Sequence, residues 1–211
     1  MNAVVLSNTY FPNIAHCIAI VRATEIVLEQ WDSYQKQTLR NRTNILGANG
    51  KLSLTVPINY SQKNRQYFKD VEVNTSINWQ SQHLKSLYSA YSTSPYFEFY
   101  IDDLTPLFEK RVTHLYDFNL SCLKAILNYF DIQKELSLTK DFDKELPSDS
   151  DFRYLAKKNA LPHFEHDKYL QVFCSKFEFT TNLSCLDLLF NEGPNAVNYL
   201  KKQSLASIVQ K

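Results

Sequence analysis

The sequence predicts an α/β protein that begins with a βαβ unit, continues with a β-hairpin extension and ends in a mainly helical C-terminal half. Residues 3–6 and 25–28 are short apolar runs of the strand type, and apolar residues at 14–23 recur at helical spacing. A strand, a helix and a second strand this close in sequence form a compact crossover unit, so we expect the two strands to be parallel.

The hairpin is predicted by the pair Asn49-Gly50, because both residues tolerate positive φ. Pro57 is expected to end the second strand or to place it at an edge. A further short strand is expected at 71–73. The residues that alternate between the turn and Pro57 are Leu52, Leu54 and Val56.

Beyond residue 77 the apolar residues recur at helical spacing, and one helix is expected over 79–91. The pair Thr105-Pro106 has the form of an N-cap followed by proline at the first helical position. It predicts a long helix that keeps one apolar face for about six turns, to Tyr129.

Length and composition suit a single domain over 1–211, with an α/β part at 1–75 that holds a basic segment and a mainly helical part at 76–211. The four cysteines lack the spacing of a zinc site or a disulfide framework. The three glycines exclude the dinucleotide-binding and P-loop motifs, and no cofactor is expected. Without a signal peptide or an apolar run of about 18 residues, the protein is expected to be cytoplasmic, with no membrane span.

The basic segment is the clearest functional signal. Residues 33–69 hold seven Lys and Arg and no Asp or Glu, although the whole chain has a net charge of only +1. If 36–42 is extended, Lys36, Thr38, Arg40 and Arg42 project to one side, and Gln37, Leu39 and Asn41 to the other. Two guanidinium groups and an ammonium suit a phosphate or a carboxylate. On charge alone, a solvated basic face explains the segment equally well.

His83 lies on the aromatic face of the expected 79–91 helix. Its imidazole is suited to acid–base chemistry near pH 7. A histidine at the edge of the core, satisfied by one hydrogen bond, is the competing interpretation, which the pattern alone favours. His163 and His166 have no further ligands at credible spacing, so we expect no metal site.

Ser184 and Asp187 have the chemistry of a nucleophile and an acid, but their spacing is that of a helix capping box. We therefore expect them to open a short helix, which Gly193 closes. Pro194 is expected to start another helix.

Distinctive blocks of residues follow one another along nearly the whole chain. They are Thr9-Tyr10-Phe11-Pro12, Tyr34-Gln35-Lys36-Gln37 with Arg40-Asn41-Arg42, Gly50 with Leu54-Thr55-Val56-Pro57, Trp79 with His83, Tyr91 with Ser94-Pro95-Tyr96-Phe97-Glu98, and the segments 117–120, 171–173, 182–184, 187–189 and 193–194. In content and order these blocks resemble the WbqC-like protein family.

The resemblance implies a role in bacterial surface-polysaccharide biosynthesis of the O-antigen type, because the family is associated with such gene clusters. The leading expectation is an acyl- or aminoacyl-transferase that acts on a nucleotide-linked amino sugar. The alternative is a non-catalytic binding or regulatory partner of a biosynthetic enzyme. The expected ligand is a nucleotide-sugar or another phosphate-bearing small molecule. RNA is a weaker option, against which the near-neutral charge argues.

For such a ligand we expect one cleft between the end of the first strand, the basic segment and the 79–91 helix. In it, His83 is the expected catalytic base. His16 is not carried over as a catalytic residue, because its position is usually aromatic in proteins that resemble this family. The expected substrate-binding residues are Tyr10, Lys36, Gln37, Arg40, Asn41, Arg42, Tyr91 and Ser94.

Overall fold

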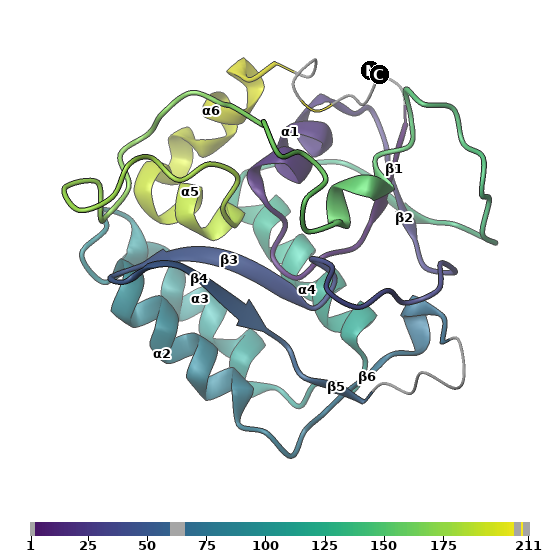
Figure 1. Cartoon of the computed structure of the whole chain (residues 1–211), viewed down its shortest axis with the longest axis horizontal. Helices are drawn as coiled ribbons and strands as arrows, with labels where there is room; N and C mark the ends of the chain where they lie inside the picture. The colour runs from purple at the N-terminus through teal and green to yellow at the C-terminus, as the bar shows by residue number, and fades with distance from the viewer. Residues whose placement is uncertain (1–2, 60–65, 205–207, 209–211) are drawn as a thin grey trace.

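The N-terminal βαβ unit is present in the computed structural model, which describes residues 3–59, 66–204 and 208. β1 (Val4–Ser7) and β2 (Ile26–Glu29) are parallel and joined by α1 (Ile14–Arg22), as predicted. β7 (Leu136–Leu138) adds a parallel strand on the other side of β2, so the sheet order is β1-β2-β7. The carboxyl ends of all three strands therefore lie at one edge of this sheet (Figure 1).

Polar groups define both ends of α1. The side chain of Asn13 accepts a hydrogen bond from the His16 backbone N–H at the N-terminus. At the other end, Lys134 Nζ donates to the carbonyls of Ile20 and Val21 at 2.7 and 2.8 Å. These contacts satisfy groups that a buried helix would otherwise leave without partners.

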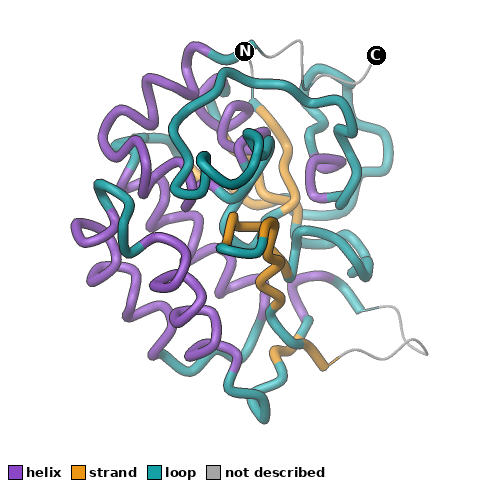
Figure 2. Tube along the Cα trace, turned by 60° about the vertical axis from the view of Figure 1, so that its left-hand side comes forward, coloured by secondary structure: helices purple, strands orange, loops and turns teal. Residues whose placement is uncertain are grey.

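The predicted hairpin consists of β3 (Arg42–Gly47) and β4 (Gly50–Thr55), with Gly50 at φ 98° in the turn. It lies between α5 (Cys185–Glu192) on one side and α2 (Trp79–Tyr91) on the other (Figure 1). Most helices gather on one side of the strands, and loops cover much of the opposite side (Figure 2).

The prediction of one long helix that begins at Pro106 is wrong. Pro106 lies inside α3 (Phe97–Glu109), and a separate helix, α4 (Leu115–Tyr129), follows. The helices are separated because the chain between them bonds to a distant strand. That strand is β6 (Glu72–Val73), which was expected at 71–73. Its Val73 N–H donates to Thr113 O at 2.8 Å. β6 pairs in turn with β5 (Ile58–Asn59).

The helix predicted at Ser184 is α5, and the Ser184 side chain caps it by accepting from Leu186 N–H. Gly193 ends α5 at φ 52°, as expected. The Asp187 carboxylate takes no part in a capping box, because three other side chains donate to it.

The remaining elements are short. They are the 3-10 turns η1 (Phe68–Asp70), η2 (Arg153–Ala156) and η3 (Gly193–Asn195), and α6 (Ala196–Lys202). Every helix in the described part of the chain is too short or too polar to span a bilayer.

Candidate functional site

The basic segment leaves the carboxyl edge of the sheet and turns back on itself. Residues 36–37 form a turn, with Gln37 in the left-handed region at φ 58°. Leu39 N–H then donates to Ala156 O at 2.7 Å. The segment 36–42 is therefore not extended, so the alternation expected of an extended chain does not apply: Lys36 is exposed, whereas Arg40 is buried.

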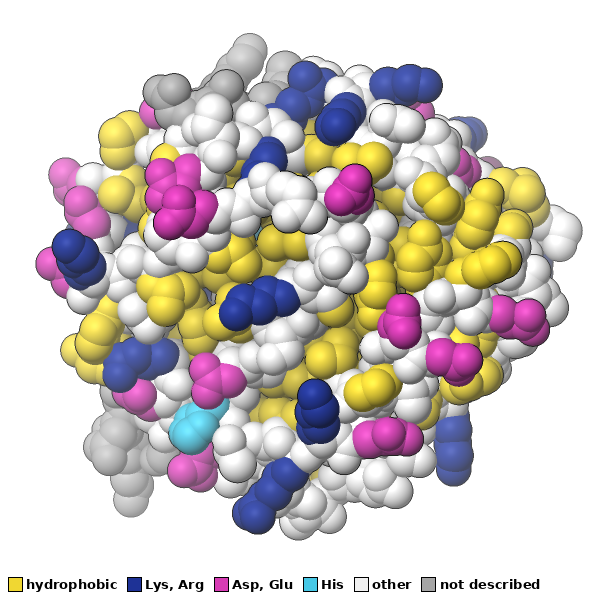
Figure 3. Space-filling view, turned by 180° about the vertical axis from the view of Figure 1, so that it is seen from behind, with side chains coloured by type: hydrophobic (Ala, Val, Ile, Leu, Met, Phe, Trp, Pro, Cys, Tyr) yellow, Lys and Arg dark blue, Asp and Glu magenta, His cyan; other side chains and the backbone are white. Residues whose placement is uncertain are grey.

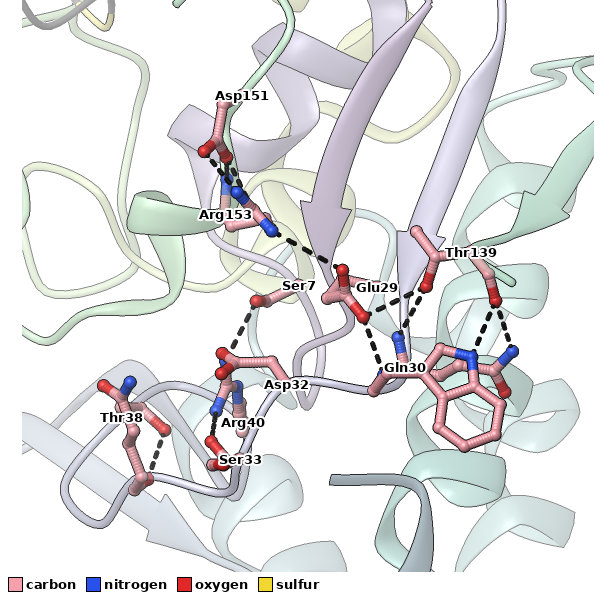
Figure 4. Close-up of polar contacts among 12 residues, drawn as sticks. Ser7, Glu29, Gln30, Asp32, Ser33, Thr38, Arg40, Thr139, Asp151 and Arg153 are labelled. Atoms are coloured by element: carbon pink, nitrogen blue, oxygen red, sulfur yellow. Dashed lines mark hydrogen bonds and ion pairs between the residues drawn. The ribbon is translucent and has the colours of Figure 1, made fainter. Parts of the chain in front are cut away.

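Arg40 points to the end of β1 and is held by groups of the protein itself (Figure 4). Its guanidinium donates to Ser33 O at 3.0 Å and to Ser7 Oγ at 3.2 Å, and forms an ion pair with Asp32. The two charged side chains are only 4% and 16% exposed. Most of the hydrogen-bonding capacity of Arg40 is thus used inside the protein.

A second group of charges lies beside this pair (Figure 4). The buried Glu29 carboxylate accepts from Trp31 N–H and Thr139 Oγ1 at 2.7 and 3.0 Å, and lies 3.5 Å from Arg153. Arg153 also donates to both carboxylate oxygens of Asp151, at 2.9 and 2.7 Å. Burial alone would raise the pKa of Asp151, but the hydrogen bonds and the charge of Arg153 outweigh it and lower that pKa, and the bond to Asp151 raises the pKa of Arg153.

A pocket of about 200 Å³ opens over these charges, and we name it the sheet-edge pocket. Acids and bases are mixed in it. Its charged lining residues are Asp32, Arg40, Asp151, Arg153 and Lys157. It lies at the edge where open α/β sheets usually bind ligands.

A second pocket, of about 330 Å³, borders the same segment, and we name it the Arg42 pocket. None of its described lining residues is acidic. No hydrogen bond or ion pair joins the Arg42 guanidinium to a described residue, and its Nε is buried. The lining residues are Tyr34, Lys36, Gln37, Asn41, Arg42 and Ile58.

An amide adds polar capacity to the Arg42 pocket. Asn41 donates through Nδ2 to Val56 O at 3.0 Å, while its buried Oδ1 has no partner among the described residues. The Arg42 pocket therefore combines two cations, whose donors suit an anion, with an amide oxygen that can accept from a hydroxyl or amino group. Lys63 and Arg65 of the basic segment lie outside the described residues.

His83 lies elsewhere, in the core. His83 is 5% exposed, and its Nδ1 is 2.9 Å from the hydroxyl of the fully buried Tyr10. Burial lowers the pKa of His83 to about 4, although a hydrogen bond with the Thr55 backbone opposes this effect. The ring is therefore neutral at pH 7. Its catalytic role stays a prediction, and its surroundings favour a satisfied core histidine.

Tyr91 and Ser94 lie at a third place. The Tyr91 hydroxyl donates to Asp187 Oδ1 at 2.7 Å, and Ser94 Oγ donates to Tyr91 O at 2.7 Å. Both residues are buried. The structure therefore does not bring the predicted residues into one cleft: Lys36, Gln37, Asn41 and Arg42 share a pocket, and Arg40, His83 and Tyr91 lie outside it.

The acidic residues at the sheet edge were not among the predicted site residues. Glu29 is the last residue of β2 and Asp32 follows three residues later, and polar residues at the carboxyl end of a parallel strand lie at the ligand-binding edge. That signal was available in the sequence. Asp151 and Arg153 come from a distant segment, and no local pattern places them there.

Charge elsewhere on the molecule is mixed. On the face opposite to that of Figure 1, positive and negative side chains are interspersed (Figure 3). The acid-free lining of the Arg42 pocket differs from that arrangement.

Comparison with known proteins agrees with the resemblance. The uncharacterized protein Rv1507c of Mycobacterium tuberculosis is 25% identical over an alignment that covers 94% of this chain and 96% of the relative. No solved structure matches the chain. Residues 8–158 match the WbqC-like protein family. The chain therefore belongs to the WbqC-like protein family.

Proposed function

We propose that this protein acts in bacterial surface-polysaccharide biosynthesis, as a transferase that modifies a nucleotide-linked amino sugar, and that the Arg42 pocket binds the diphosphate of that ligand. Family membership supports the biological role. The observation that carries the ligand class is the Arg42 guanidinium, which has no partner among the described residues and lines an acid-free pocket.

The chemistry of the pocket suits a diphosphate. The planar guanidinium of Arg42 can donate two parallel hydrogen bonds to phosphate oxygens, and Lys36 adds a second positive charge. Asn41 and Gln37 supply amide groups that can bond to a sugar or a base.

The sheet-edge pocket is suited to the sugar. Both pockets are lined by residues of the 34–42 segment: Thr38 and Arg40 line one, and Lys36 and Arg42 line the other. The mixed charges of the sheet-edge pocket can donate to and accept from hydroxyl and amino groups. In this arrangement Arg40 holds the segment in place through Asp32, and Arg42 contacts the ligand.

Isothermal titration calorimetry with a panel of nucleotide-diphosphate sugars and with inorganic pyrophosphate tests this proposal. Wild type is expected to bind at least one of them, and Arg42→Gln to bind it at least about tenfold more weakly, through the loss of a charge-assisted hydrogen bond. Lys124→Gln removes an exposed cation from α4 and is expected to bind as wild type does. If no ligand of the panel binds, or if Arg42→Gln binds as tightly as wild type, the ligand class is wrong.

One observation favours a non-catalytic partner of a biosynthetic enzyme as the second candidate. No His, Asp or Glu is among the described residues that line the Arg42 pocket, so the pocket itself supplies no general base near neutral pH. A transfer assay with the bound nucleotide-sugar separates the two functions. Turnover supports the transferase, and ligand binding without turnover, together with co-purification of a biosynthetic enzyme, supports the partner.

A further inference from the structure

A third pocket lies at the far end of the β3–β4 hairpin, between its turn and the second half of α2. Its volume is about 350 Å³, and we name it the hairpin-tip pocket. Residues 47–50, at the turn of the hairpin, are among its lining residues. Its polar side chains are Asn49, Lys51, Lys85, Ser86 and Ser89.

The hairpin-tip pocket is positively charged and acid-free in its described lining. No hydrogen bond or ion pair joins Lys51 or Lys85 to a described residue. Two more cations lie close by. Lys176 Nζ donates to Ala48 O at 2.5 Å, and partial burial together with the Lys158 ammonium lowers the pKa of Lys51.

Like charges gathered without a counter-ion repel one another. A bound anion removes this repulsion and supplies the missing partner. The Ser89 hydroxyl beside the ammonium groups can donate to a further oxygen of such an anion, whereas Ser86 Oγ already donates to Gln82 O at 2.9 Å. Compact ammonium groups suit the concentrated charge of a phosphomonoester, which carries about −1.5 to −2 at neutral pH.

The hairpin-tip pocket is separate from the Arg42 pocket. β3 runs from Arg42 to Gly47, and its ends are about 17 Å apart at a rise of about 3.3 Å per residue. The two neighbouring phosphates of one diphosphate cannot reach both pockets across that length.

We propose that the hairpin-tip pocket is a second anion-binding site, which takes the phosphomonoester group of a small molecule distinct from the ligand of the Arg42 pocket. Lys51 and Lys85 hold the phosphate oxygens, and the Ser89 hydroxyl donates to one of them. This site does not depend on the function proposed for the Arg42 pocket, because the two pockets share no described lining residue.

The test uses adenosine 5′-monophosphate, a phosphomonoester, and its cyclic 3′,5′ form, a diester with a single charge, as a matched ligand pair. Binding is measured by calorimetry in the Arg42→Gln protein, so that the Arg42 pocket contributes little. The monoester is expected to bind at least about tenfold more tightly than the diester. In the same Arg42→Gln background, the double variant Lys51→Gln/Lys85→Gln is expected to lose that preference. The control substitution Lys124→Gln, added to that background instead, is expected to keep it.

Three results overturn the proposal: no binding of the monoester, equal binding of the monoester and the diester, or unchanged binding by the double variant. Lys51 and Lys85 are exposed, so the double variant is expected to keep the wild-type melting temperature within a few degrees. A lower melting temperature would show that the double variant loses binding because it unfolds. In that case the single variant Lys85→Gln replaces it in the test. Failure here leaves pyrophosphate binding at Arg42 untouched.

Discussion

Arg40 and Arg42 are separated by one residue, yet they line different pockets and have different partners. Arg40 is paired with Asp32 at the sheet edge, and Arg42 makes no bond to a described side chain. The difference follows from the chain path, because the 36–37 turn and the start of β3 place Arg40 inward. We therefore assign Arg40 to the stability of the segment and Arg42 to ligand binding.

Arg40→Ala is expected to lower the free energy of unfolding by about 3 kcal/mol, because it leaves Asp32 without its buried partner. Urea unfolding monitored by circular dichroism measures the loss. Arg42→Ala is the matched control and is expected to cost less than about 1 kcal/mol, since no bond to a described residue is broken. Equal losses in the two variants would contradict the division of roles.

Stability is expected to fall as the pH drops below 6.5. Burial lowers the pKa of His83 to about 4 and that of His16 to about 3, whereas both titrate near 6.5 in the unfolded chain. Between these values the unfolded chain binds protons that the folded protein does not, which favours unfolding. Each group contributes up to about 1.4 kcal/mol per pH unit.

His83→Gln is therefore expected to be less stable at pH 7.5 but to lose less stability between pH 6 and pH 4.5 than wild type does. Urea unfolding at both pH values gives the two slopes. His163→Gln replaces an exposed histidine and is expected to keep the wild-type slope. A His83→Gln slope equal to that of wild type would show that this histidine is not buried in its neutral form.

Gly193→Ala is expected to destabilise the protein by more than about 3 kcal/mol, through backbone strain and a clash. At φ 52° an added Cβ would lie 2.5 Å from ring carbons of Tyr96. Gly50→Ala, at φ 98° but with its nearest contact at 3.9 Å from the Phe177 ring, carries the strain without the clash and is expected to cost about 1 kcal/mol. Thermal unfolding compares the two, and a similar cost for both would argue against the packing of Tyr96 on Gly193.

The Asp187 carboxylate is fully buried and accepts from Tyr91, Tyr169 and Gln171 at 2.7, 2.6 and 3.2 Å. Tyr91→Phe removes one donor to this charge and is expected to cost about 2 kcal/mol. Tyr88→Phe alters a half-exposed ring of the same helix and is expected to be neutral. Ligand binding at the Arg42 pocket should be unchanged in both, and a selective loss in Tyr91→Phe would restore Tyr91 to the binding site.

Local patterns predicted the local parts of the fold. The βαβ unit and the Asn49-Gly50 hairpin are set by residues near one another in sequence, and both are present. The prediction of one long helix was wrong because a hydrogen bond between residues distant in sequence decides where the chain leaves the helix. That bond joins Val73 to Thr113. The strand β7 was missed for the same reason, since only its pairing with β2 identifies so short a segment.

The site, like the fold, was predicted only where local sequence determines it. Composition located the basic segment, and four of its predicted residues line the Arg42 pocket. Alternation along an extended chain did not separate Arg40 from Arg42, because a turn with a left-handed Gln37 reverses the segment. The ion partners of Arg40 and Arg153 are fixed by tertiary packing, and charge counting along the sequence does not assign them.

A crystal structure of the protein with the tightest-binding nucleotide-sugar of the panel tests diphosphate binding at Arg42. We expect diphosphate oxygens within hydrogen-bonding distance of the Arg42 guanidinium, with the Arg40–Asp32 pair unbroken. Density for the diphosphate at another place, with the Arg42 pocket empty, would contradict it.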